Sequence, residues 1–174
     1  MTETNRVGII AAYEWQPEVE GFYEGVLYQN SDAHIDIQFV NDWDEKDLAM
    51  QYYRAMLSNN TDVIYPAGGD AFSVSIVENA MSDGIYSIGF VNDQQALGGQ
   101  SVLTSTIQHI DKLYVYAIKE LQQGDVKGGI YNFGFKEDVI TMGPYSEHLK
   151  EYFKDQLDHV IEDYIENGLL PHEE

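Results

Sequence analysis

The residues best suited to hold a ligand fall in short polar segments that follow apolar runs. Trp15 offers a ring that could stack on a planar ligand or, equally well, cover the end of the core. Asp42 and Asp44 flank Trp43, and two carboxylates beside an aromatic ring suit a sugar hydroxyl or a cation. The competing interpretation of this acidic pair is a solvated helix cap.

A glycine pair, Gly68-Gly69, is the strongest local signal in the sequence. Glycines let the backbone approach a ligand, and the helix expected to follow would offer free N–H groups at its start. No Gly-Lys-Ser/Thr sequence follows, so a phosphate-binding Walker loop is excluded. Asp70 stands where a phosphate would bind and would repel it. A neutral ligand or a plain tight turn fits this segment better.

The fourth candidate segment is Asn92-Asp93-Gln94-Gln95, which places three amides and one carboxylate in a row. Amide groups donate and accept hydrogen bonds, so they suit hydroxyl groups or the edge of a nucleobase. An ordinary solvated loop is the alternative interpretation.

Catalytic and metal-binding patterns are missing from the sequence. There is no cysteine, and no Gly-x-Ser-x-Gly motif surrounds a serine. The five histidines show neither metal-ligand spacing nor a neighbouring nucleophile; they are His34, His109, His148, His159 and His172. We therefore expect no catalytic residue, no metal site and no cofactor.

The charge of the chain restricts its partners. Its formal net charge is −21, with 9 Lys and Arg among 174 residues. Nucleic-acid binding requires a basic surface that neutralises phosphates, so direct contact with nucleic acid is excluded. Anionic membrane surfaces are disfavoured for the same reason.

Apolar runs and helical stripes alternate along the first two thirds of the chain, which predicts a parallel sheet with right-handed crossovers. Pro17 opens one predicted helix, Gly84 and Gly124 end two others, and Ser105 or Thr106 is expected to cap the last of them. The strands are predicted near residues 7–12, 35–40, 63–65, 85–90 and 101–104. Ligands of such α/β sheets bind beyond the carboxyl ends of the strands, where the four segments lie.

The remainder of the chain has a different pattern. Residues 130–135 and 139–142 predict two short strands, as in a hairpin, and Ser146 begins a long helix with one apolar and one acidic face. We divide the domain into an α/β lobe, residues 1–125, and a C-terminal hairpin with an acidic helix, residues 126–174. The first six residues form no signal sequence. The chain as given is expected in the cytoplasm, or at the membrane if an upstream signal or lipoprotein segment exists.

A response-regulator receiver is another α/β protein of this size, but the sequence excludes it. A receiver needs an acidic cluster after the first strand, an aspartate after the third and a lysine after the fifth. Here the first strand ends in Ala11-Ala12-Tyr13, the third in Tyr65-Pro66 and the fifth in Thr104-Ser105.

Several of these segments occur in the order of one known family. Residues 61–69 resemble the "G-A-D-V-I-…-A-G-G" segment of the basic membrane protein family, the PnrA-like nucleoside-binding lipoproteins of ABC transporters. Residues 85–94 resemble its "Y-x-I-G-V-D-x-D-Q" segment, and residues 102–111 its "V-L-T-S-…-K-x-x-D" segment. Residues 21–25 resemble "F-x-x-G-F-x-x-G", and residues 165–168 its closing "I-x-x-G" helix.

This resemblance covers nearly the whole chain and implies one Rossmann-like lobe of a periplasmic-binding-protein type I fold. Such proteins clamp a ligand between two lobes, and this chain resembles the second lobe with the C-terminal tail. The resemblance implies a first lobe upstream.

Three departures from the family pattern concern the ligand. Val91 stands where the family has a ribose-binding aspartate, and Gln108 stands where it has a lysine. Phe72 lies in the stretch where the family continues with glycines, so we expect its ring to fill space that glycine leaves open. A branch of the family described as positive regulators of competence, the Med-like group of bacilli, is similar in its "F-V-N-D-W" loop and acidic tail.

Three hypotheses follow from the residues and the resemblance. The first is a non-catalytic ligand-binding or ligand-degenerate lobe that regulates indirectly; its cleft would be lined by Trp15, Asp42, Gly68, Gly69, Asp93 and Gln108. The second is the nucleoside-binding component of an ABC transporter. The third is a protein-interaction module, in which the exposed half-cleft binds another protein, the missing lobe or a second copy of the chain.

Overall fold

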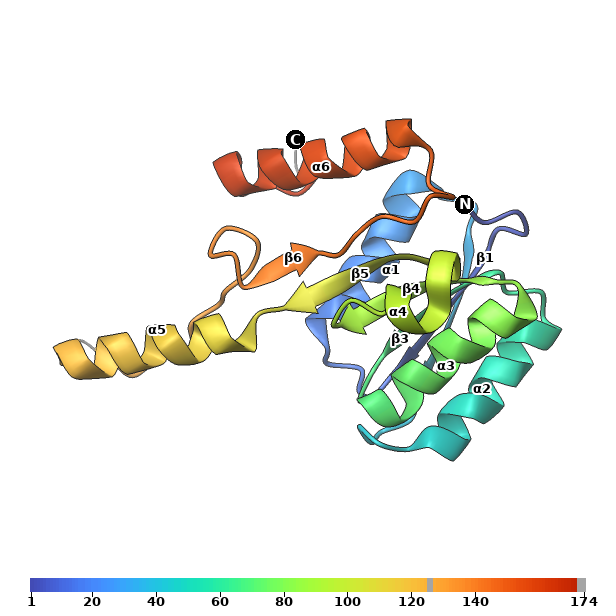
Figure 1. Cartoon of the computed structure of the whole chain (residues 1–174), viewed down its shortest axis with the longest axis horizontal. Coiled ribbons are helices and arrows are strands. Elements are labelled where there is room, and N and C mark those ends of the chain that lie inside the picture. Colours follow the sequence, from blue (N-terminus) through green and yellow to red (C-terminus); the bar gives the residue numbers. More distant parts are fainter. Residues whose placement is uncertain (125–126, 172–174) are drawn as a thin grey trace.

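A computed structural model describes residues 1–124 and 127–171. Six strands form one sheet in the order β2-β1-β3-β4-β5-β6 (Figure 1). Five of them are parallel, and β6 joins the edge antiparallel to β5. The strands are β1 (Arg6–Ala11), β2 (His34–Phe39), β3 (Val63–Ala67), β4 (Tyr86–Val91), β5 (Val102–Gln108) and β6 (Ile140–Met142).

Helices cover both faces of this sheet. The helices are α1 (Pro17–Gln29), α2 (Lys46–Ser58), α3 (Asp70–Asp83), α4 (Gln95–Gly98), the 3-10 turn η1 (Gly99–Ser101), α5 (Ile110–Gln123) and α6 (Glu151–Asn167). Successive side chains of a strand point to opposite faces, and Ile9 and Ile10 of β1 show this directly. Ile10 packs in the cluster with α2 and α3, whereas Ile9 packs with Val19 of α1.

The predicted α/β class and the parallel sheet are confirmed. Strand and helix alternate from β1 to α5, α1 begins at Pro17, and Gly84 and Gly124 end α3 and α5 in the left-handed conformation. Left-handed backbone strains residues that carry a Cβ atom, so glycine at these two stops has a direct conformational reason.

The prediction that Ser105 or Thr106 caps a helix is wrong, because β5 continues to Gln108 and α5 begins at Ile110. The longer strand is paired on both sides, with β4 and with β6. The Ser105 hydroxyl accepts a hydrogen bond from the Gln94 N–H, 3.2 Å away, instead of capping a helix. A long-range partner has therefore extended the strand through residues whose local preference is a cap.

The predicted hairpin of residues 130–135 and 139–142 is also wrong. Residues 130–135 form no strand, and β6 pairs with β5. The terminal helix begins at Glu151 and not at Ser146, because Ser146 is buried and bonded elsewhere. Its hydroxyl donates to the Gln100 carbonyl at 2.7 Å, and its N–H donates to the Leu103 carbonyl at 2.8 Å.

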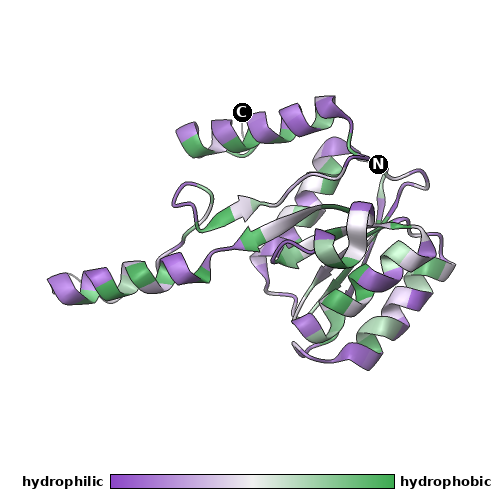
Figure 2. Ribbon diagram, viewed as in Figure 1, coloured by the Kyte–Doolittle hydropathy of each residue, from purple (hydrophilic) through white to green (hydrophobic). Residues whose placement is uncertain are grey.

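Two helices stand apart from the packed layers. α5 projects away from the sheet, and α6 lies beyond the edge formed by β6 (Figure 1). Neither helix has a fully buried residue. Apolar residues of α6 gather on the side that faces the rest of the domain (Figure 2). The boundary predicted at residues 125–126 lies outside the described residues.

Among residues 1–124 and 127–171, no helix combines the length and the apolar character needed to cross a membrane.

Candidate functional site

The loops after β1 and β2 meet in an aromatic cluster at the carboxyl edge of the sheet. The rings of Tyr13 and Trp15 stack with centroids 5.1 Å apart, and the Trp43 ring meets Trp15 edge-on at 6.2 Å. Trp15 is 67% exposed and Trp43 is 41% exposed. Trp15 therefore presents a ring surface to solvent, as a stacking contact requires, and does not seal the core.

Gly69 joins the loop after β3 to this cluster. Its N–H donates to the Trp43 carbonyl at 3.0 Å. A Cβ atom at Gly69 would lie 2.4 Å from that same oxygen, so only glycine fits there without a shift of the backbone. Gly69 is also the N-cap of α3, and Asp70 lies in the first turn of that helix.

Gly68 is a glycine for a different reason. It is buried, and a Cβ atom there would lie 1.8 Å from the Phe72 ring. Phe72 is fully buried in the core cluster between the sheet, α2 and α3. The Phe72 ring therefore occupies space that a glycine leaves open, as expected, and that space belongs to the core.

The acidic residues of the loop after β2 bind within their own loop. Asp42 accepts a hydrogen bond from the Asp44 N–H at 2.8 Å, and both side chains are exposed. The cap of α2 is Glu45, whose carboxylate accepts from the Leu48 N–H at 3.2 Å. Asp42 therefore remains an exposed carboxylate beside Trp43, without the predicted capping role.

Two of the three amides in the loop after β4, those of Gln94 and Gln95, are engaged with the protein. Gln94 is buried; its side-chain oxygen accepts from the Phe90 N–H at 3.3 Å. Gln95 donates to the Pro144 carbonyl at 3.0 Å. Asp93 is exposed and accepts from the Gln95 N–H at 3.0 Å. Of the three, only Asp93 keeps a solvent-facing group for a ligand.

Val91, the last residue of β4, has a strained backbone. Its φ is +67°, a conformation that β-branched residues rarely adopt. The Asn92 N–H donates to the Phe90 carbonyl at 2.8 Å, which closes a three-residue turn centred on Val91. Turns of this type with positive φ at the centre are rare and strained. Aspartate, asparagine and glycine tolerate this conformation far better than valine.

Two substitutions at Val91 separate strain from packing. Asparagine tolerates positive φ, whereas threonine keeps the branched Cβ and has nearly the shape of valine. Both substitutions replace an apolar side chain with a polar one, so the loss of apolar contacts is similar in the two variants. We expect Val91→Asn to be about 1 kcal/mol more stable than Val91→Thr in urea unfolding. Equal stabilities of the two variants would show that the turn carries no strain.

Gln108 ends β5 beside the start of α1. Its amide donates to the Glu18 carboxylate at 2.9 Å. The same carboxylate acts on the phenol of Tyr65: burial raises the pKa of Tyr65 above its ordinary value, and the Glu18 charge adds to the increase. Gln108 thus lies close to the loop that carries Trp15. Its amide already donates a hydrogen bond to a protein carboxylate.

Gln16 is a structural residue of this edge that the sequence analysis did not single out. Its side chain is 2% exposed. The side-chain oxygen accepts from the Tyr13 N–H at 2.8 Å, and the amide donates to the Ala67 carbonyl at 3.1 Å. Gln16 therefore fixes the loop that carries Trp15 to the end of β3. Its place just before Pro17, at the start of a helix, is the only signal of this role in the sequence.

The structure unites part of the predicted site. Trp15 and Gly69 both contact Trp43, Asp42 is its neighbour in the chain, and Gln108 reaches Glu18 at the start of α1. Gly68 lies beneath this surface, and the hydrogen bond described for Asp93 stays within its own loop. Over the part of the chain that the structure describes, no group of three His, Cys, Asp or Glu side chains could hold a metal ion. The edge offers aromatic rings and carboxylates, which suit a neutral polar ligand.

Comparison with known proteins identifies the relatives of this chain. The family model described as "ABC transporter substrate-binding protein PnrA-like" matches residues 1–174. The transcriptional activator protein med of Bacillus subtilis is 37% identical over all of this chain and 55% of its own length. Basic membrane protein B of Borreliella afzelii is 31% identical over 78% of this chain and 40% of its own.

Solved structures show the same fold. A transcriptional activator of the comK gene from Bacillus halodurans superposes with a TM-score of 0.91 at 39% identity, over 99% of this chain and 60% of that one. An ABC transporter solute-binding protein from Aeropyrum pernix superposes with a TM-score of 0.65 at 22% identity, over 97% of this chain and 47% of that one. The chain therefore spans about half of the length of the relatives it matches.

Proposed function

The chain belongs to the PnrA-like family of ABC transporter substrate-binding proteins. From this premise we propose that it is a non-catalytic lobe whose carboxyl edge of the sheet does not bind a nucleoside. In this proposal the lobe keeps the binding-protein fold and regulates indirectly, through a changed ligand or a protein partner. The acidic net charge of −21 supports an indirect role, because direct contact with DNA would be repelled.

The observation that carries this proposal is the uncharged side chain at both Val91 and Gln108. Val91 keeps a positive φ that suits aspartate, yet its side chain accepts no hydrogen bond from a ribose hydroxyl. Gln108 is neutral where the resemblance implies a lysine, and its amide is already bonded to Glu18. Both positions lack the charged group that the family resemblance implies for a ligand contact.

Thermal unfolding with guanosine tests the proposal. A nucleoside at 100 times its Kd would add about 2.7 kcal/mol of stability, which raises the Tm of a domain of this size by about 5–10 °C. We expect no measurable shift for this chain. The double variant Val91→Asp, Gln108→Lys restores both charged groups and should show the larger shift of the two proteins. A shift of several degrees in the unchanged chain would contradict the loss of nucleoside binding.

A second candidate function is protein interaction through α5. Large apolar side chains of this helix are exposed, with Tyr114 at 68%, Ile118 at 55% and Leu121 at 65%. Beside them lies a hollow of ≈ 350 Å³ lined by Leu113, Tyr116, Ala117, Glu120, Leu121, Tyr131 and Phe133. Apolar surface of this kind marks an interface, so α5 would contact the rest of a longer two-lobed protein or another protein.

Light scattering of the isolated chain tests this second function. Exposed apolar residues on α5 should drive concentration-dependent self-association when no partner is present. We expect Ile118→Glu to shift the chain toward the monomer, because a charge would be desolvated at each contact. The matched control, Lys119→Gln, changes a charge on the same helix at an exposed residue outside the hollow. A wild-type chain that stays monomeric at every concentration would argue against an interface on α5.

A further inference from the structure

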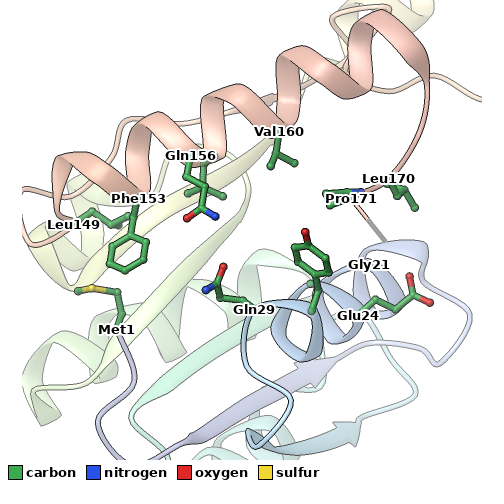
Figure 3. A pocket seen from close by; sticks show the side chains of 13 residues that line it. Met1, Gly21, Glu24, Gln29, Leu149, Phe153, Gln156, Val160, Leu170 and Pro171 are labelled. Atoms are coloured by element: carbon green, nitrogen blue, oxygen red, sulfur yellow. The ribbon is translucent and has the colours of Figure 1, made fainter. Parts of the chain in front are cut away.

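A groove separates α1 from α6 on the side of the domain opposite α2 and α3 (Figure 3). Its volume is ≈ 460 Å³. We call it the α1/α6 groove; its floor is Gly21, Gly25 and Tyr28 of α1, and its roof is Phe153, Leu157 and Val160 of α6. Met1, which precedes β1, also lines it. The groove therefore lies toward the amino end of the strands, away from the aromatic cluster at their carboxyl end.

The two glycines leave the floor of the groove open. No atom lies within 4 Å of a Cβ atom placed at Gly21 or at Gly25. Most of the surrounding side chains are apolar and partly exposed, with Tyr28 at 58% and Leu157 at 39%. The polar side chains of the lining are Glu24, Gln29 and Gln156. The contact between α1 and α6 is thus unfilled, and apolar surface on both helices remains in contact with water.

The two helices that form the groove are strongly acidic. α1 carries Glu18, Glu20 and Glu24 and no Lys or Arg. α6 has a single cation, Lys154, against Glu151, Asp155, Asp158, Glu162, Asp163 and Glu166. Glu24 itself lines the groove. Most α6 carboxylates lie on the face turned away from the groove, so the charge that favours a positive occupant comes from Glu24 and from the net charge of −21. An occupant that is apolar toward the groove and positive at its borders would complement both features.

This charge disfavours two other apolar occupants. A fatty acid or an anionic lipid would place its negative head near Glu24 and in the negative field of the chain. A second copy of this chain would bring a further formal charge of −21. The roof residues Phe153 to Val160 follow one face of α6 for about 10 Å, two turns of helix. We propose that the α1/α6 groove binds an amphipathic helix of another protein, with its apolar face in the groove and Lys or Arg along its borders.

A synthetic peptide of Leu and Lys at helical spacing is the probe. A scrambled peptide of the same composition and a Leu/Glu peptide of the same pattern are its controls. Fluorescence anisotropy should show the Leu/Lys helix binding at least about tenfold more tightly than either control. Affinity should fall with added salt without vanishing, since only the charged part of the contact is screened.

Two variants place the peptide in the groove. Gly25→Leu fills the floor and improves helix propensity, so it should fold and should weaken binding by at least about tenfold. Leu157→Lys replaces an apolar roof residue with a like charge and should do the same. Gly134→Leu, at a site that is also open, is the matched control and should bind normally. Two outcomes would overturn the proposal. One is equal peptide binding by the unchanged chain and the three variants. The other is that Gly25→Leu loses binding of a fatty acid, laurate, while it still binds the peptide.

Discussion

Replacing Phe72 by alanine is expected to lower the free energy of unfolding by about 3–5 kcal/mol, the usual cost of truncating a buried aromatic residue. The Phe72 side chain is 0% exposed and belongs to the cluster that joins α2 and α3 to the sheet. Truncation leaves a cavity directly over Gly68, where the backbone of β3 passes into α3. Urea unfolding followed by far-UV circular dichroism measures the loss, and Tyr152→Ala, at a residue that is 68% exposed, is the control.

The partnership of Phe72 with Gly68 can be measured separately. Gly68→Ala alone should destabilise the domain, because its new methyl group would lie 1.8 Å from the Phe72 ring. In the Phe72→Ala background the same methyl group enters vacant space. The double variant should therefore lose less stability than the sum of the two single variants. A small loss in Phe72→Ala, together with simple additivity, would instead place the ring at a solvent-facing cleft.

The sheet was predictable because its central strands are apolar without interruption. Residues 7–12 and 63–65 read as strands buried on both faces, and β1 and β3 lie side by side at the centre of the sheet. The helix boundaries at Pro17, Gly84 and Gly124 were equally local signals, since each residue type fixes the backbone by itself.

The errors fall where a distant segment decides the local structure. Ser105 and Thr106 favour a helix cap in isolation, but pairing with β4, and of Thr106 also with β6, keeps them in an extended strand. Ser146 would also suit a helix start, but its buried hydroxyl donates to Gln100, 46 residues earlier in the chain. Such partners are far apart in sequence and leave no local pattern.

The candidate site was predictable as an edge of the sheet but not residue by residue. Gly68 and Gly69 look equivalent in the sequence, yet one makes room for Phe72 and the other for the Trp43 carbonyl. Gln94 was a candidate ligand contact in the sequence. In the structure its buried side chain accepts a hydrogen bond from the Phe90 N–H and stabilises its own loop. Polar side chains near strand ends serve either the loop or a ligand, and only their hydrogen-bond partners distinguish the two uses.

The strain at Val91 connects fold and function. A positive φ at a valine costs stability, and strained backbone persists where a functional site once needed the conformation. The turn around Val91 is held by Gln94 and by the Asn92 N–H, and neither hydrogen bond involves the Val91 side chain. A loop that was free to relax would not have retained this geometry. The strain is therefore consistent with the proposed loss of nucleoside binding in a lobe that keeps the family fold.

Gln16→Leu is expected to lower the free energy of unfolding by about 1–3 kcal/mol, the cost of leaving a buried hydrogen-bond donor without an acceptor. Leucine fills nearly the same space as glutamine, so packing changes little. The Tyr13 N–H loses its acceptor, while the Ala67 carbonyl keeps the Ala12 N–H as a donor at 3.0 Å. The loss is therefore local to the loop that carries Trp15. Urea unfolding gives the stability, and Gln51→Leu on the exposed side of α2 is the matched control.

Tryptophan fluorescence distinguishes a positioning role of Gln16 from a purely structural one. Trp15 stacks on Tyr13, and Trp43 meets both rings, so release of the loop should change the emission of both tryptophans in the folded state. If Gln16→Leu were to lose stability with unchanged native emission, Gln16 would brace β3 without positioning the aromatic cluster. Changed emission at conditions where the protein is fully folded would identify Gln16 as the residue that holds Trp15 in place. The exposed Trp15 ring at the carboxyl edge of the sheet would then depend on a buried amide one residue away.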